Sequence, residues 1–138
     1  MPSTTATVLT ALIAWALLLL ILMEVLRSRL VLLGAIAANK FKPDNAGLSP
    51  FMQRLARAQA NCIEGLPIFG GLLLVALATG RTEVTDALAP WMLAARLLQS
   101  SVHLASTSVL AVQLRFSAFA VQMAIAAIWA WVLLSAQG

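Results

Sequence analysis

The sequence predicts an all-α fold, an integral membrane four-helix bundle that occupies residues 1–138 as a single domain. Two observations lead to this prediction. Of the residues, 62% are hydrophobic and only 10% are charged, whereas about a quarter of the residues in an average soluble domain are charged. The apolar residues also form four continuous runs, each near the roughly 20 residues that a membrane-spanning helix needs. These runs do not alternate between apolar and polar residues, so they do not fit the strands of a membrane barrel.

The first span is expected at about residues 7–26. No basic residue precedes it, and the apolar run is longer than the core of a typical signal peptide, so we expect it to be retained as a helix. The segment that follows, about residues 31–53, is long for a loop of a helical bundle. It contains Pro43, Gly47 and Pro50, residue types that are typical of turns.

The other three spans are expected at about residues 60–79, 85–107 and 114–135. Gly80 is a plausible stop for the second of them, because glycine commonly follows the last turn of a helix. Pro90 lies near the start of the third, where it either occupies the first turn or kinks the helix slightly.

The basic residues predict the orientation of the bundle. The net charge is +4, but the nine basic residues are scattered beside apolar runs, so nucleic acid is not an expected partner and the charges are interpreted as topology signals. The loop between the first two spans carries most of them: Arg27, Arg29, Lys40, Lys42, Arg54 and Arg57. The next loop balances Arg81 with Glu83 and Asp86. The positive-inside rule therefore places the first loop in the cytoplasm and both termini outside. Three tryptophans then fall near the outer interface, as an aromatic belt requires: Trp91, Trp129 and Trp131.

Polar residues inside the spans are the candidate functional residues, because an ionisable side chain at the centre of a spanning helix costs roughly 2.5–3.5 kcal/mol. In each of two spans, three of them share one helical face. Those of the second span are Arg57, Asn61 and Glu64, and those of the third are Arg96, Gln99 and His103. Together with Arg115 at the start of the fourth span, they are expected to converge at the cytoplasmic side of the bundle.

Two interpretations of this set remain open. Glu64 can pair with Arg57 or Arg96 as a structural contact between helices, with Asn61 bonding across an interface. Alternatively, several cationic donors around one carboxylate leave surplus positive charge, which suits an anionic ligand that bears carboxylates. No metal site is expected, and Cys62 is interpreted as a small packing residue rather than a nucleophile.

Residues 57–69 read R-A-Q-A-N-C-I-E-G-L-P-I-F. This segment closely resembles the second-helix signature of the MAPEG family (membrane-associated proteins in eicosanoid and glutathione metabolism), with Arg, Asn, Glu, Pro and Phe at the spacing of the family. Arg96 followed by His103 resembles the third-helix pattern, and Q-L-R-F at 113–116 resembles the entrance to the fourth helix. The length and the four-span layout resemble the bacterial branch, which implies a multi-pass protein of a bacterial inner membrane.

The resemblance implies a homotrimer in lipid that binds glutathione in a cleft between subunits, near the cytoplasmic face. Arg57, Gln59, Asn61 and Glu64 would hold the tripeptide, and Arg96 and Gln99 would complete the binding set. Arg115 matches an arginine that stabilises the glutathione thiolate, and His103, which stands where relatives have a tyrosine, can still donate a hydrogen bond. These two are the expected catalytic residues. The implied reaction is addition of the thiolate to a lipophilic electrophile from the bilayer, or reduction of a lipid hydroperoxide.

The sequence departs from the better-known synthases of the family in two ways. It contains no tyrosine, and Gly65 follows Glu64 where those synthases have an aromatic residue. A second hypothesis is therefore a binding or scaffold protein that kept the fold without catalysis. A small multidrug transporter is a third hypothesis, but such transporters carry a carboxylate within the first span, and here the first is Glu24 at its end.

Overall fold

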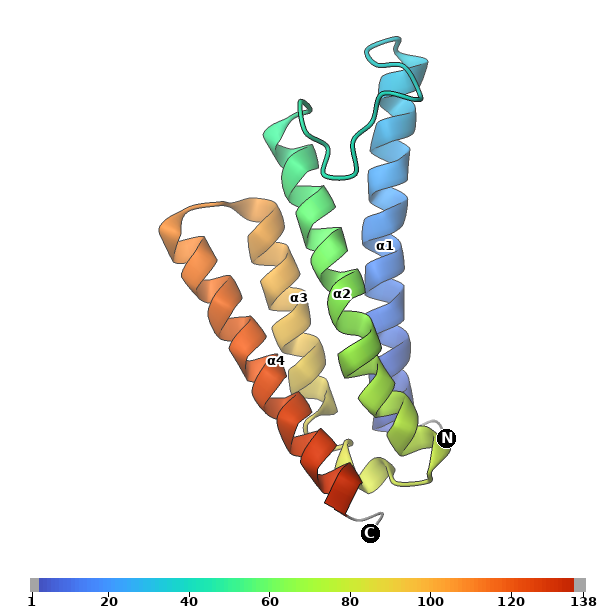
Figure 1. The fold of residues 1–138 in the computed structure, drawn as a ribbon, viewed down its shortest axis with the longest axis vertical. Coiled ribbons are helices and arrows are strands. Elements are labelled where there is room, and N and C mark those ends of the chain that lie inside the picture. Colours follow the sequence, from blue (N-terminus) through green and yellow to red (C-terminus); the bar gives the residue numbers. More distant parts are fainter. Residues whose placement is uncertain (1–2, 136–138) are drawn as a thin grey trace.

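The computed structural model describes residues 3–135, and over this range it is an all-α bundle of four helices that run alternately up and down (Figure 1). The helices are α1 (Thr4–Leu32), α2 (Pro50–Ala78), α3 (Ala89–Ala105) and α4 (Val109–Ser135), and a short 3-10 helix, η1 (Thr82–Val84), precedes α3. The long α1–α2 connection and the α3–α4 turn lie at one end of the bundle, which we call the loop end (Figure 1). The predicted all-α four-helix fold is confirmed.

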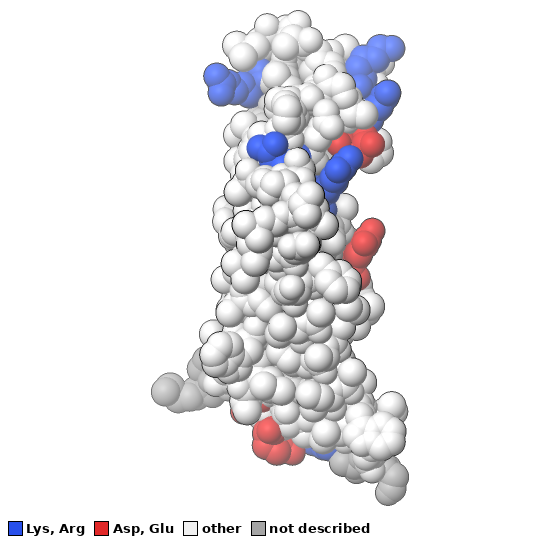
Figure 2. All heavy atoms as spheres, turned by 90° about the vertical axis from the view of Figure 1, so that its left-hand side faces the viewer, with Lys and Arg blue, Asp and Glu red and all other residues white. Residues whose placement is uncertain are grey.

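The lengths and the apolar composition of the helices fit a membrane. Three helices, α1, α2 and α4, are long and apolar enough to cross a bilayer. The third predicted span, about residues 85–107, proves shorter, because α3 has 17 residues and therefore a length of about 25 Å. Figure 2 shows most of the basic side chains near the loop end, acidic side chains both there and at the opposite end, and a largely uncharged surface between the two ends. The chain is a multi-pass integral membrane protein.

The starts of α1 and α2 are set by caps rather than by the limits of the apolar runs. The Ser3 hydroxyl accepts a hydrogen bond from the Ala6 N–H (3.1 Å) at the start of α1, and Ser49 accepts one from Met52 (3.2 Å) at the start of α2. Pro50 occupies the first position of α2, where its missing N–H costs nothing. As a result α2 begins ten residues before the span predicted at 60–79. The polar residues of its first turns therefore lie before the predicted apolar span.

The core forms two clusters of buried apolar side chains. The cluster far from the loop end includes Leu73, Met92 and Trp129, all fully buried, and the cluster nearer the loop end packs α1 against α2 around Leu19 and Leu55. The prediction that Trp129 belongs to an interfacial belt is therefore wrong, because this side chain is 0% exposed. The other two tryptophans of the predicted belt, Trp91 and Trp131, are exposed.

Hydrogen bonds between distant segments close the end opposite the loop end. The Thr5 backbone N–H donates to Asp86 Oδ1 (2.9 Å), and the Thr5 and Thr85 hydroxyl oxygens lie 2.6 Å apart. Arg81 donates to the carbonyl of Leu133 (3.1 Å), where the last carbonyls of α4 lack helical partners. The η1 region thus ties the start of α1 to the end of α4.

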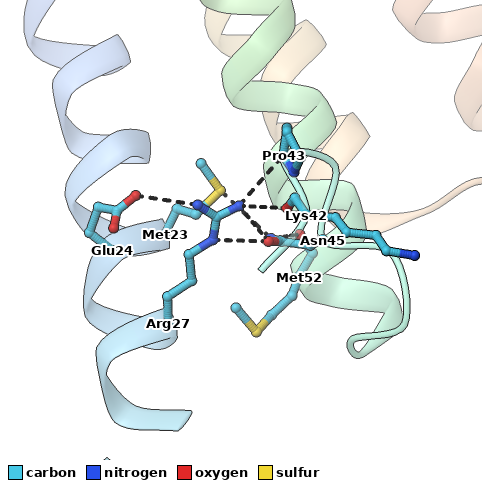
Figure 3. Close-up of polar contacts among 7 residues, drawn as sticks. All are labelled: Met23, Glu24, Arg27, Lys42, Pro43, Asn45 and Met52. Carbon is cyan, nitrogen blue, oxygen red and sulfur yellow. Dashed lines mark hydrogen bonds and ion pairs between the residues drawn. The ribbon is translucent and has the colours of Figure 1, made fainter. Parts of the chain in front are cut away.

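At the loop end, Arg27 and Asn45 fold the α1–α2 connection down between the two helices (Figures 1 and 3). Arg27 donates to Asn45 Oδ1 from Nε (3.0 Å) and Nη2 (2.7 Å), and Asn45 Nδ2 donates to the Met52 carbonyl (2.7 Å). Asn45 is fully buried and adopts a positive φ of 57°, a conformation that asparagine tolerates better than most residues. Arg27 also forms an ion pair with Glu24, in which Nη1 lies 3.6 Å from Oε1.

Candidate functional site

A layer of polar side chains crosses the interior of the bundle. Asn61 of α2 accepts two hydrogen bonds on its Oδ1 atom, from Arg96 Nη1 (2.8 Å) and from Gln99 Nε2 (3.2 Å), both on α3. Arg96 and Gln99 are almost completely buried, whereas Asn61 is half-buried. The structure thus brings together three of the residues that the sequence singled out.

The same layer contains a residue that the sequence analysis missed. Gln122 of α4 is fully buried and donates from Nε2 to Gln99 Oε1 (2.8 Å) and to the Ala118 carbonyl (3.1 Å). The signal was a single amide in an otherwise apolar stretch, seven residues after Arg115. Seven residues are about two helical turns, so Gln122 lies on the same face of α4 as Arg115, farther from the loop end.

Arg57, His103 and Arg115 form a second layer, about one to two helical turns nearer the loop end. Arg57 is four residues before Asn61, and His103 is four residues after Gln99, which sets each of them one turn from the polar layer. His103 is buried and lies within electrostatic range of both Arg115 and Arg57. Two cations and an imidazole therefore gather where α2, α3 and α4 approach the loop end.

A groove beside Arg115 joins the two layers. It has a volume of about 200 Å³ and is lined by Gln99, Val112, Arg115, Phe116 and Phe119. The Arg115 Nε atom is buried and has no hydrogen-bond partner within residues 3–135. The groove thus sets the side chain of Arg115 and an amide against aromatic and aliphatic side chains, an arrangement that suits an anionic group attached to an apolar one.

Glu64 does not make the structural contacts that one interpretation of the sequence requires. Its side chain is exposed, and among the described residues it has neither an ion pair nor a hydrogen bond; Arg96 bonds to Asn61 instead. Arg57 is also exposed on α2, and Gln59 is half-buried. A carboxylate on an otherwise apolar helix surface is costly against lipid, so this face of α2 is suited to a ligand or to another protein surface.

Arg96 explains the glycine that departs from the family pattern. A Cβ atom added at Gly65 would lie 2.7 Å from Arg96 Nη2, well inside the 3.4 Å at which ordinary van der Waals contact begins. The guanidinium lies 5.7 Å from the ring centroid of Phe69, and its Nη2 atom is buried without a partner in the described part of the chain. The absence of a side chain at Gly65 therefore leaves room for the buried guanidinium of Arg96. An aromatic side chain at this position would fill that space.

Cys62 lines a small cavity beside Arg96, whereas the two arginines of α1 lie outside the polar layer. The Cys62 thiol is buried and 3.2 Å from the Ser100 hydroxyl, in keeping with a packing role. Arg27 is held by the α1–α2 connection, whereas Arg29 is exposed and borders a surface cavity of about 740 Å³ along α1. Within residues 3–135 no group of three or more histidine, cysteine, aspartate or glutamate side chains is placed to bind a metal ion.

Comparison with known proteins gives one match. The model of the MAPEG family matches residues 5–135, almost the whole chain. Neither the curated proteins nor the solved structures yielded a match.

Proposed function

The chain belongs to the MAPEG family, and on this premise we propose that it is a glutathione-dependent transferase or peroxidase that acts on lipophilic electrophiles within the membrane. The observation that carries the proposal is the groove at Arg115, whose guanidinium-bearing side chain lines the same surface as Phe116 and Phe119. A thiolate and an apolar acceptor need these two environments side by side.

The charges around the site match glutathione, a tripeptide with two carboxylates, one ammonium group and one thiol. Arg57 and Arg115 provide cations for carboxylate or thiolate, and charge-assisted hydrogen bonds of this kind are about twice as strong as neutral ones. Glu64 is the carboxylate that is free to meet the ammonium group. Asn61 and Gln59 supply amide groups for the peptide bonds of the ligand.

In the proposed reaction Arg115 stabilises the glutathione thiolate, because a guanidinium beside a thiol favours its anion, the attacking species. In a conjugation, the sulfur forms a bond to the electrophilic carbon, and the electron pair passes to the leaving or electron-withdrawing group. In a peroxide reduction, the sulfur attacks the terminal oxygen and the O–O bond breaks, which gives glutathione sulfenic acid and an alkoxide that takes up a proton. A second glutathione then displaces water from the sulfenic acid and forms the disulfide. His103 is the nearby group that donates a hydrogen bond to the departing atom.

We further propose that the site is completed by neighbouring subunits of a homotrimer. The support is the face of α2 that leaves Arg57 and Glu64 exposed on a membrane helix, where lipid contact is unfavourable. Because Arg27 is held by Asn45, Arg29 is the cation of α1 that we assign to the cleft of a neighbour. The loop end is assigned to the cytoplasm of a bacterial cell, since it carries most of the basic residues.

A non-catalytic binding protein is the second candidate, and the absence of tyrosine favours it. A transporter gains no support, because Glu24, the carboxylate of α1, pairs with Arg27.

Turnover separates the first two candidates. The purified protein in detergent is assayed with glutathione and a chloronitrobenzene, a simple lipophilic electrophile, as wild type, Arg115→Ala and Lys40→Ala. Lys40 is an exposed cation of the α1–α2 connection and serves as the matched control. We expect conjugation by the wild type and the control, with kcat at least tenfold lower in Arg115→Ala. Glutathione binding without turnover toward this electrophile or a lipid hydroperoxide would favour the non-catalytic candidate.

A further inference from the structure

The hydrogen bonds of the polar layer have a fixed direction. A guanidinium only donates hydrogen bonds, so the Asn61 atom that faces Arg96 Nη1 must be the oxygen. Gln99 donates to this same oxygen from Nε2. The Asn61 amide is therefore held by its oxygen, and its Nδ2 group is left without a partner within residues 3–135. Since Asn61 is half-buried, this donor is the part of the amide that a ligand can meet.

The direction of Gln99 is set in turn by Gln122. An amide side chain can present either its oxygen or its nitrogen to a neighbour, because the two ends have nearly the same shape. Gln122 Nε2 donates to Gln99 Oε1 (2.8 Å), so the opposite end of Gln99, its Nε2 group, faces Asn61. Gln122 Nε2 also donates to the Ala118 carbonyl one turn back on α4. This second bond keeps the nitrogen of Gln122, rather than its oxygen, on the side of Gln99.

We propose that Gln122 is a positioning residue for the glutathione site: it orients Gln99, and through Gln99 it holds Asn61 so that its Nδ2 group points outward as a donor to a carbonyl or carboxylate of the ligand. The inference rests on the proposed function. Gln122 is fully buried and lies about two turns from Arg115, so it does not touch the ligand and acts only through the chain of amides. Without its donor, Gln99 is free to turn over and present its oxygen to Asn61, which then competes with Arg96 for the orientation of the Asn61 amide.

The test is the steady-state kinetics of Gln122→Met, which keeps the length and volume of the side chain but removes the donor. Removal of one ligand hydrogen bond made equally in the ground state and the transition state raises KM and leaves kcat unchanged. We expect KM for glutathione to rise about five- to tenfold, as is typical for the loss of one hydrogen bond, with kcat within about twofold of wild type. Gln113→Met, the same change at an exposed position of α4, should leave both constants unaltered.

A double mutant shows whether Gln122 acts through Asn61. If it does, Gln122→Met in the background of Asn61→Ala should leave KM for glutathione unchanged, because the group that Gln122 positions is already gone. The inference would be overturned if Gln122→Met raised KM for glutathione by the same factor with and without Asn61→Ala. A fall in kcat with an unaltered KM in Gln122→Met would also overturn it.

A measurement that needs no ligand keeps the inference separate from the proposed function. The side-chain amide of Asn61 is observed by nitrogen-15 NMR of the full chain in detergent micelles and identified by its loss in Asn61→Ala. We expect Gln122→Met to shift these signals and Gln113→Met to leave them in place. If the wild type fails to bind glutathione, the proposed function fails, while shifted signals would still show that Gln122 orients Asn61. Unshifted signals would overturn the inference, whatever the outcome with glutathione.

Discussion

Gly65→Ala is the most informative single substitution in the bundle, because it adds one carbon beside the buried guanidinium of Arg96. The new Cβ would lie 2.7 Å from Arg96 Nη2 and 3.0 Å from a ring carbon of Phe69. Arg96 is a flexible side chain, but it cannot retreat freely, since its Nη1 atom is bonded to Asn61 and its guanidinium lies over Phe69. We expect the contact to be relieved by loss of the Arg96–Asn61 hydrogen bond.

The size of the effect follows from that bond. A hydrogen bond to a charged group contributes about 1.5–3 kcal/mol, and the change from glycine to alanine inside a helix returns about 0.5–1 kcal/mol. The net loss in the free energy of unfolding is therefore about 1–2 kcal/mol. Glutathione affinity should fall as well, because Asn61 loses one of the two bonds that orient it.

Gly71→Ala is the matched control on the same helix, because a Cβ there meets no atom within 4 Å. The assay is thermal unfolding in detergent followed by circular dichroism, together with glutathione calorimetry. Gly65→Ala should unfold at a lower temperature than wild type, and Gly71→Ala at the same or a higher one. The reasoning about Arg96 would be refuted if the two variants had equal stability and equal glutathione affinity.

Three further predictions concern the loop, the core and the cations of α1. Asn45→Gly should lower the free energy of unfolding by about 3 kcal/mol through the loss of the side-chain hydrogen bonds of Asn45. Asn45→Ala should lower it by about 1 kcal/mol more, because alanine is strained at a φ of 57°. Equal unfolding temperatures for these two variants would exclude the strain. Leu73→Ala, at a fully buried position, should cost about 2–5 kcal/mol, whereas Leu74→Ala, 58% exposed, should cost much less, and a reversed order in denaturant titrations would contradict the assigned core. Arg27→Ala should lower the unfolding temperature by several degrees through the α1–α2 connection, whereas Arg29→Ala should leave it unchanged and weaken glutathione binding; weaker binding in Arg27→Ala with full stability would reverse these roles.

Much of the fold could be predicted from the sequence, because apolar runs report directly on membrane spans. The limits of the helices could not be predicted in the same way. Hydropathy locates the buried length of a span, whereas α2 begins at a serine cap and a proline in the polar segment before it. Likewise α3 was predicted longer than it is, because residues 85–88, just before Ala89, form a turn rather than α-helix.

The candidate site was predictable only where residues share a helix face. Helical spacing predicted that Asn61, Arg96 and Gln99 converge in one region of the bundle, and the structure shows hydrogen bonds among them. Spacing could not show that Glu64 is exposed, because this depends on the rotation of α2 against its neighbours. Gln122 was overlooked because an uncharged amide breaks an apolar pattern only weakly.

Long-range contacts were beyond any local pattern. The bond between Arg27 and Asn45 joins a helix to a turn 18 residues away, and no periodicity relates the two. For Trp129 the interfacial preference of tryptophan was the wrong guide, since its side chain packs inside the bundle, in the core cluster far from the loop end.

The central claim is that the polar layers hold glutathione, and calorimetry in detergent tests it most directly. Glutathione is titrated into the wild type, Arg57→Ala and the control Lys40→Ala. Saturable binding to the wild type and the control, weakened at least tenfold in Arg57→Ala, is the predicted result. Absence of binding to the wild type at millimolar glutathione, or equal binding by all three proteins, would contradict the account.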